Sequence, residues 1–143
     1  KYPKSGYLNK LNIISISSVE IVVSRKFLLK FNISFNINLG LGTNYPSCEE
    51  NIFLLDVLGS GGKIYHLPLF THSHPFVDRS KDFTNPEILL AKGVFCKRFG
   101  GFLGCLLMVL WLGRSFYNCR NLNISTKLIN GYLNSNTVLS SYE

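Results

Sequence analysis

The segment SCEENIFLLDVLG, residues 47–59, decides how the middle of this chain folds. Ser47 and Glu50 have the spacing of a capping box, in which the serine oxygen accepts a hydrogen bond from the backbone N–H of Glu50 and the glutamate side chain reaches back. Apolar residues then follow near helical spacing: Ile52, Phe53, Leu55 and Leu58. The glycines at positions 59, 61 and 62 favour the end of the helix there. The segment therefore predicts a helix that begins at an acidic pair.

The chain before this helix reads as extended structure, a short helix and a loop. Residues 11–23 are rich in Ile and Val and partly alternate with serine, which predicts an extended segment. Residues 24–31 predict a short helix with Ser24 as its N-cap. Residues 32–46 are rich in Asn and Gly, which tolerate positive φ and therefore favour turns and loops.

The chain after the helix alternates a strand with further helices. Residues 63–72, KIYHLPLFTH, predict a strand, and Pro68 indicates an edge strand or the end of the strand. Asn85-Pro86 predicts a helix start, because proline is favoured at the first helical position. That helix is expected to run to about Phe99, where a pair of glycines follows. Residues 124–134 predict an amphipathic helix, followed by a frayed polar tail.

Residues 102–113, FLGCLLMVLWLG, are apolar nearly all round. Twelve residues are too short for a bilayer span, which needs about 20. Basic residues lie on both sides: Lys97, Arg98, Arg114 and Arg120. Two interpretations stay open, namely an interfacial helix on an anionic membrane surface and a helix buried against the rest of the protein.

The composition favours a folded protein and argues against nucleic-acid binding. The 143 residues are 46% hydrophobic and 16% charged, which is enough apolar material for a core. The formal net charge is +7, but the 15 Lys and Arg residues are scattered and form no long basic run. The 4 cysteines show no C-x-x-C spacing, so a reducing, cytoplasmic setting is expected. Because the chain opens with Lys1, we expect it to be a piece of a longer protein.

A glycine-rich loop leads into the acidic pair at the helix start. The loop contains Gly40, Gly42 and Asn44, and the pair is Glu49 and Glu50. A carboxylate in the first turn of a helix lies in a favourable dipole field, and it can act as a general base if a hydroxyl group reaches it. A loop of Gly and Asn beside it would let the molecule that carries this hydroxyl group approach the carboxylate. The alternative is that the pair only caps the helix.

Two histidines follow the predicted strand at its end, His72 and His74. A neutral imidazole is a common metal ligand, so these side chains are candidate ligands of a divalent metal ion. The alternative is that both are ordinary polar residues of the surface.

The chain from 39 to 70, LGLGTNYPSCEENIFLLDVLGSGGKIYHLPLF, resembles the acceptor-side half of family 2 glycosyltransferases of the GT-A fold. Those enzymes carry a glycine-rich loop, an acidic pair followed by an apolar helix, a strand resembling G-x-K-I-Y-x-x-P, and a histidine. The segment AKGVFCKRFGG at 91–101 resembles the helix that commonly follows. In all, the resemblance covers roughly residues 13–105.

The resemblance implies transfer of a sugar from a nucleotide-sugar donor to a saccharide or lipid-linked acceptor. It implies that Glu50, where the family commonly has Asp, is the catalytic base beside Glu49. It also implies a divalent metal ion, Mg²⁺ or Mn²⁺, held by His74 or His72. The chain has no D-x-D motif and no βαβ run with a phosphate-binding turn, so the donor-binding half is expected to lie outside it.

The resemblance also implies the fold class and the organisation of the chain. It implies an α/β fold, with a partial GT-A-type mixed sheet, flanking helices and a helical C-terminal extension. Residues 1–101 are then the acceptor-side part of the glycosyltransferase domain, and residues 102–143 are the extension. The implied location is the cytoplasm, at the inner face of the cell membrane. The alternative function is a non-catalytic membrane-peripheral or interaction module.

Overall fold

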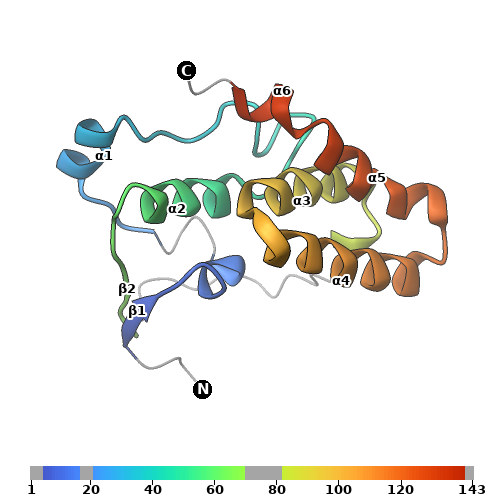
Figure 1. Cartoon of the computed structure of the whole chain (residues 1–143), viewed down its shortest axis with the longest axis horizontal. Coiled ribbons are helices and arrows are strands. Elements are labelled where there is room, and N and C mark those ends of the chain that lie inside the picture. Colours follow the sequence, from blue (N-terminus) through green and yellow to red (C-terminus); the bar gives the residue numbers. More distant parts are fainter. Residues whose placement is uncertain (1–4, 17–20, 70–81, 141–143) are drawn as a thin grey trace.

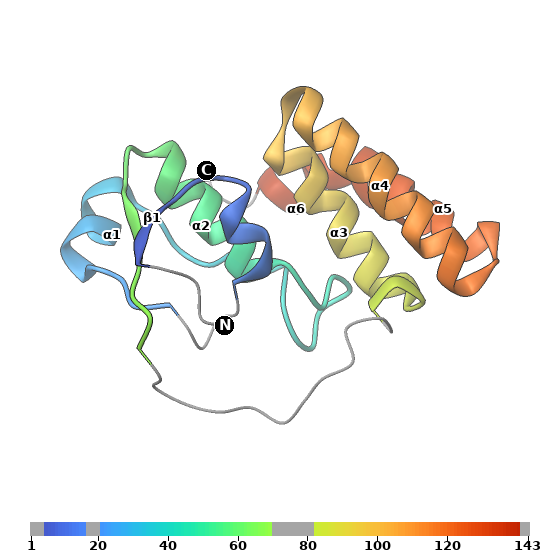
Figure 2. The same cartoon turned by 90° about the horizontal axis from the view of Figure 1, so that it is seen from below.

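The computed structural model of the protein describes residues 5–16, 21–69 and 82–140. Its elements in chain order are β1 (Gly6–Leu8), η1 (Asn12–Ser15), α1 (Arg25–Phe31), α2 (Glu49–Gly59), β2 (Ile64–His66), α3 (Pro86–Phe99), α4 (Gly101–Cys119), α5 (Leu122–Leu133) and α6 (Ser135–Leu139). Figures 1 and 2 show the strands with α1 and α2 on one side of the molecule and α3, α4 and α5 on the other. The fold is therefore mixed, as expected, but it is mostly helical.

The sheet in the described residues is a small antiparallel pair. Strand β1 pairs with β2, and Tyr7 lies opposite Tyr65. Their rings pack edge to face with centroids 5.1 Å apart. The strand predicted at 63–72 is confirmed over Ile64–His66 and is wrong over 67–69, which are described but not in a strand, and the residues from 70 to 72 lie outside the described part.

The extended segment predicted at 11–23 is wrong over Asn12–Ser15, which form the 3₁₀ helix η1. Local side-chain bonds explain the difference. The Asn9 side chain accepts hydrogen bonds from the backbone N–H groups of Leu11 and Asn12, and the Asn12 side chain accepts one from Asn9. Asparagine side chains compete with sheet formation in this way, and here they outweigh the β preference of the isoleucines. Ile13 of η1 is fully buried.

Two predicted helix starts are confirmed with their capping residues. The Ser24 side chain accepts a hydrogen bond of 3.4 Å from the backbone N–H of Phe27 at the start of α1. The Asn85 side chain accepts bonds of 2.9 and 3.2 Å from Glu87 and Ile88 at the start of α3. Each cap satisfies N–H groups that have no partner within the helix.

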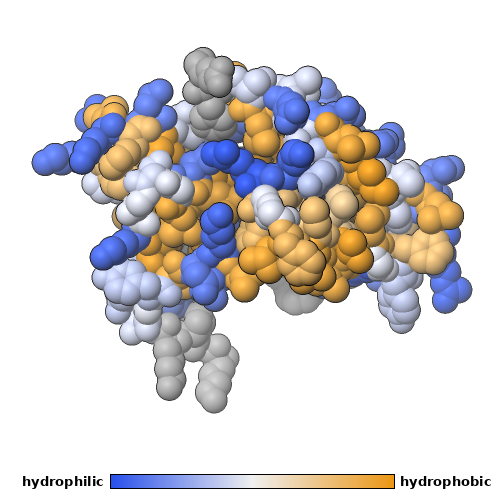
Figure 3. Space-filling model, in the orientation of Figure 1, coloured by the Kyte–Doolittle hydropathy of each residue, from blue (hydrophilic) through white to orange (hydrophobic). Residues whose placement is uncertain are grey.

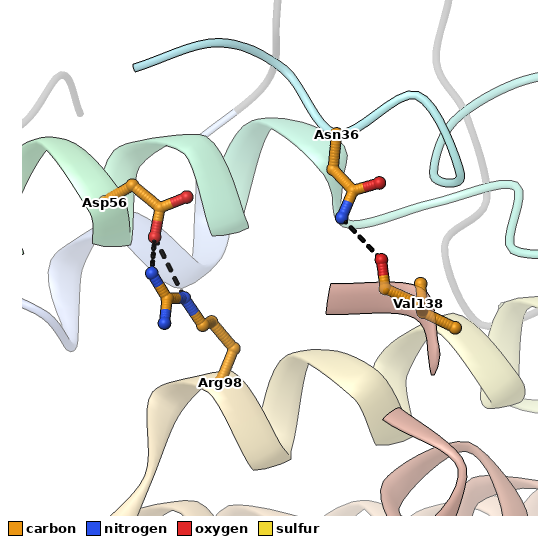
Figure 4. A network of polar contacts seen from close by, with 4 residues as sticks. All are labelled: Asn36, Asp56, Arg98 and Val138. Atoms are coloured by element: carbon orange, nitrogen blue, oxygen red, sulfur yellow. Dashed lines mark hydrogen bonds and ion pairs between the residues drawn. The ribbon is translucent and has the colours of Figure 1, made fainter. Parts of the chain in front are cut away.

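Helix α2 is the centre of the hydrophobic core. It is apolar nearly all round, and most of its residues are buried. Its buried side chains share one cluster with residues of η1, the 33–39 loop, α3 and α6, among them Ile13, Leu39, Val94, Phe95 and Val138. The Arg98 guanidinium of α3 also pairs with the carboxylate of Asp56 on α2, as Figure 4 shows. The two sides of the molecule therefore meet at α2 and α3.

Helices α3 and α5 cross in backbone contact because glycines lie at the crossing. A Cβ atom at Gly131 would overlap the carbonyl oxygen of Leu90, and one at Gly93 would overlap that of Leu128. Helix α4 packs on the same pair, and a Cβ at Gly104 would overlap the carbonyl oxygen of Cys96. The absence of side chains at these positions lets the three helices form one tightly packed unit.

The C-terminal helices differ from the sequence expectation in two respects. The apolar stretch at 102–113 is part of the longer helix α4, which continues to Cys119. The tail after Asn134 is not frayed over 135–139, because it forms α6. There Val138 is buried, and its carbonyl oxygen accepts a 2.8 Å hydrogen bond from the Asn36 side chain (Figure 4).

Candidate functional site

A cavity of about 210 Å³ lies at the start of α2. The lining residues come from the end of η1, the start of α2, the segment before α3, and helices α3 and α4. The polar and charged lining residues are Ser47, Cys48, Glu50, Asn51, Asp82 and Lys92, and the apolar ones are Ile14, Ile16, Phe95 and Trp111. A charged pocket with an apolar wall is the kind of place where polar ligands are oriented.

The start of α2 is not the capping box expected from the sequence. The N-cap residue is Cys48, in the left-handed region at φ 68°, and its side chain makes no capping hydrogen bond. Ser47 therefore lies one residue outside the position the motif requires. The Asn51 side chain instead donates a 2.8 Å hydrogen bond to the carbonyl oxygen of Ile13, which ties this turn to η1.

The two glutamates of the acidic pair point to different surroundings. Glu50 lines the cavity. Glu49 packs on the loop before the helix, since a Cβ at Gly40 would lie 3.2 Å from its carboxyl carbon. Its Oε2 atom is buried, and it has no hydrogen-bond partner among the residues that the structure describes. Of the two predicted catalytic carboxylates, Glu50 is thus the one that lines the cavity.

Lys92 brings a positive charge to the same cavity. Its Nζ atom lies 4.9 Å from the ring centroid of Phe83 and 4.9 Å from that of Trp111. Trp111 in turn stacks on Phe95 with centroids 5.9 Å apart. An ammonium over aromatic faces is attracted by their negative π surface, so the rings fix the charge at the cavity wall.

Cys48 also lines the cavity, but its thiol does not have the properties of a reactive cysteine. It is almost fully buried, and burial raises the pKa of its thiol from 9.0 to about 11, although the nearby Lys92 opposes this. A thiol with this pKa is protonated at neutral pH, whereas a nucleophilic cysteine needs the thiolate. Its Sγ lies 3.7 Å from the hydroxyl oxygen of Ser47. Cys48 therefore serves packing rather than catalysis.

Stability is expected to fall as pH rises from about 9 to 11, because the unfolded Cys48 thiol releases its proton near pH 9 while the folded one retains it. A shift of this size corresponds to about 2–3 kcal/mol. Cys48→Ala lacks the group, so the stability advantage of the natural protein over this variant should shrink across that window. Urea unfolding at fixed pH under reducing conditions measures both proteins. A constant difference would contradict a thiol buried in this way.

The loop expected to form an acceptor wall is an ordered turn. Gly40 donates a 2.9 Å backbone hydrogen bond to the carbonyl oxygen of Tyr45, and the Thr43 hydroxyl donates one of 2.9 Å to Gly40. Gly40 and Gly42 have φ of 102° and 86°, a region that favours glycine. Asn44 lies within this turn. Through the contact of Gly40 with Glu49, the loop reaches the acidic pair.

The same loop forms one wall of a second, more open hollow of about 470 Å³. Residues of α6 form the opposite wall. The lining residues are Ile37, Asn38, Gly42, Thr43, Asn44, Tyr45, Thr137 and Val138. Amide and hydroxyl groups around one tyrosine give the hollow the mixed polar and aromatic character that suits a polar organic ligand.

The predicted metal ligands His72 and His74 lie outside the described residues. Within 5–16, 21–69 and 82–140, no group of three His, Cys, Asp or Glu side chains could hold a metal ion. The cavity contains two carboxylates, those of Glu50 and Asp82, which are oxygen ligands of the type that Mg²⁺ and Mn²⁺ prefer. The described residues therefore offer part of a ligand set, and the metal ion stays a prediction.

Sequence reasoning placed Glu50 at the helix start but missed two of its charged neighbours. Asp82 belongs to no recognisable sequence motif, and Lys92 stands out only as part of the segment 91–101. One signal in the sequence could have marked Lys92, namely a lysine one turn from Phe95 on a helix otherwise apolar toward the core.

We compared the chain with models of protein families, with curated proteins and with solved structures, and none of them matches it.

Proposed function

We propose that this chain is the acceptor-side part of a glycosyltransferase that moves a sugar from a nucleotide-sugar donor to a saccharide or lipid-linked acceptor. The observation that carries the proposal is the position of Glu50, in the first turn of α2 and at the wall of a charged cavity. The proposal joins this position to the sequence resemblance over residues 13–105. The GT-A fold and the nucleotide-sugar site belong to the proposal and would be completed by a part of the enzyme outside this chain.

In the proposed reaction Glu50 is the general base. Its carboxylate takes the proton from an acceptor hydroxyl as the hydroxyl oxygen forms a bond to the anomeric carbon of the donor sugar. The bond from that carbon to the nucleoside diphosphate breaks, and the leaving group departs with the electron pair. The positive end of α2 stabilises the carboxylate before the proton moves.

Lys92 has a role in this scheme because the leaving group is an anion. A cation held at the cavity wall by two aromatic rings supplies charge where negative charge develops. Asp82 lines the same cavity, so the charged groups there are one ammonium and two carboxylates.

The acceptor would lie along the 40–45 loop. This loop contacts Glu49, the neighbour of the proposed base, and its residues also line the hollow of about 470 Å³. Tyr45 and the amides of Asn38 and Asn44 line that hollow. A saccharide could stack on the tyrosine ring while its hydroxyl groups bond to the amides.

The test is an activity assay on the product of the complete reading frame that contains this chain. We expect the frame to extend upstream of Lys1 with a nucleotide-binding region and a D-x-D motif. The purified protein should release a nucleoside diphosphate from one member of a nucleotide-sugar panel, and release should depend on an added lipid or saccharide fraction. A frame that starts next to Lys1, or a complete product that neither binds nor cleaves any nucleotide sugar, would remove the catalytic proposal.

The second candidate is a non-catalytic membrane-peripheral or interaction module. The observation that favours it is the exposure of α4, since 11% of the most apolar window of this helix is buried. The assay above separates the two candidates, because this module would bind its partner without consuming a nucleotide sugar.

A further inference from the structure

Helix α4 carries a row of apolar side chains that no described part of the protein covers. Phe102 is 80% exposed and Leu110 is 60% exposed. The members of this row, which we call the α4 apolar face, are Phe102, Leu103, Leu106, Val109, Leu110, Phe116 and Tyr117. They recur every three or four residues, so they form one stripe along the helix. Figure 3 shows continuous hydrophobic surface where Figure 1 places α4.

The opposite side of α4 is fixed to the protein. Gly104 and Ser115 are buried there, and the Ser115 hydroxyl donates a 2.8 Å hydrogen bond to the carbonyl oxygen of Phe83. Leu107 and Trp111 pack against the core. By length and composition α4 could cross a membrane, but a helix that crosses alone would lose this packing. The structure therefore favours a helix whose apolar face is available for binding while its opposite side stays packed on the protein.

The surroundings of the α4 apolar face are basic. Residues 86–140 contain 6 basic residues and one acidic residue, Glu87. Lys92 lines the cavity and Arg98 pairs with Asp56, which leaves Lys97, Arg114, Arg120 and Lys127. Arg114 and Arg120 are exposed on or next to α4 itself. Lys97 is also exposed, with its Nζ 5.0 Å above the ring of Tyr132, whose hydroxyl lies 3.7 Å from Cys105 of α4. An apolar stripe among cations is complementary to anionic lipid.

We propose that the α4 apolar face binds the surface of an anionic phospholipid bilayer, with the helix lying parallel to the membrane plane. The apolar side chains enter the boundary between headgroups and acyl chains, and the basic side chains contact the phosphates. A large exposed apolar patch commonly marks an interaction site, and the local positive charge selects anionic lipid among the possible occupants.

This orientation has a consequence that rests on the function proposed above. Trp111 belongs to α4 and also lines the cavity that contains Glu50. A docked α4 would therefore hold that cavity within about one helix diameter, roughly 10–12 Å, of the bilayer surface. At this distance the acceptor class is a lipid-linked saccharide, because its reactive end extends from the membrane into the cavity.

The experiment is flotation of the whole chain with lipid vesicles, without any sugar substrate. The protein should float with vesicles of phosphatidylglycerol and phosphatidylcholine, and much less with phosphatidylcholine alone. The double variant Phe102→Glu/Leu110→Glu should bind anionic vesicles about tenfold or more weakly, since it loses two apolar insertions and adds two negative charges. The matched control is Leu29→Glu/Leu41→Glu, which changes two exposed leucine-sized side chains and the same charge away from α4.

Four results would overturn the proposal. In the first, the two double variants bind equally well, and in the second the natural chain does not bind anionic vesicles. In the third, the natural chain forms a stable dimer that the α4 double variant does not form. In the fourth, alkaline carbonate does not extract the bound protein. The third would assign the face to a second copy, and the fourth would indicate a spanning helix. Circular dichroism verifies that both variants fold. Because no substrate is present, failure here is separate from failure of the glycosyltransferase assay.

Discussion

Replacing Gly131 with alanine is expected to lower the free energy of unfolding by about 3 kcal/mol. The added Cβ would overlap the carbonyl oxygen of Leu90 and lie 2.8 Å from its carbonyl carbon and 2.9 Å from its Cα. These are backbone atoms of α3 and cannot rotate away, so α3 and α5 would have to separate. Alanine favours a helix over glycine by about 1 kcal/mol, which is too little to offset the loss of this contact.

The matched control is Gly113→Ala on α4. Gly113 is also inside a helix, and a Cβ there would meet no atom within 4 Å. That variant should therefore become more stable by up to about 1 kcal/mol. Denaturant unfolding followed by circular dichroism compares the two variants with the natural protein. Equal stability of the two variants would show that α3 and α5 do not cross in backbone contact.

The parts of the fold that depend on interactions within one helical turn could be predicted from the sequence. Ser24 and Asn85 cap α1 and α3 as expected, because a capping side chain bonds to N–H groups two or three residues later. Pro86 starts α3, where its missing N–H removes no helical bond. Helix α2 could be predicted as well, because its residues are mostly apolar and the helix lies inside the hydrophobic core.

The sequence predictions are wrong where two local tendencies compete, or where a contact between residues far apart in the sequence determines the backbone conformation. The isoleucines of 12–15 favour a strand, but Asn9 and Asn12 close a turn through their side chains. The capping box at Ser47 yields to Cys48 at positive φ, in a turn that the Asn51–Ile13 bond ties to η1. That bond joins residues far apart in the sequence, so no short motif indicates it.

One part of the candidate site could be predicted from the sequence, namely the acidic pair with the loop before it. The acidic pair and the loop before it are contiguous in sequence, and the structure brings Gly40 into contact with Glu49. Lys92 reaches the cavity because α3 lies against α2 and because Phe83 and Trp111 surround its ammonium group. These residues come from three separate segments. Their convergence depends on the packing of α3 with α4, which composition and periodicity do not specify.

The length of α4 changes the weight of the two interpretations of its apolar stretch. The 12 apolar residues at 102–113 suggested either a buried helix or an interfacial one. The helix extends to Cys119, and Phe116 and Tyr117 continue the exposed row. Two of its residues are buried, Gly104 and Ser115, which is not the pattern of a core helix. The described structure thus shows an exposed helix rather than a buried core helix, and the vesicle experiment tests whether it binds a membrane surface.

In the complete enzyme that we propose, replacing Glu50 with glutamine is expected to lower kcat by about 10²–10⁴-fold, because the variant keeps the size of the side chain but cannot accept the proton of the acceptor hydroxyl. The KM for the donor should change little, since the substitution leaves the cavity volume and Lys92 in place. Steady-state release of the nucleoside diphosphate, measured over a range of donor and acceptor concentrations, separates the two parameters.

The neighbouring residue supplies the control. Glu49→Gln makes the same chemical change one residue away, but Glu49 packs on Gly40 rather than lining the cavity. Its effect on kcat should stay below about tenfold, within what lost positioning of a loop explains. Glu50→Asp should recover part of the activity because it restores a carboxylate with a shorter reach. If Glu49→Gln were as inactive as Glu50→Gln, or if Glu50→Gln kept full activity, the base would have to be another group, and Asp82 would be the next carboxylate of the cavity to replace.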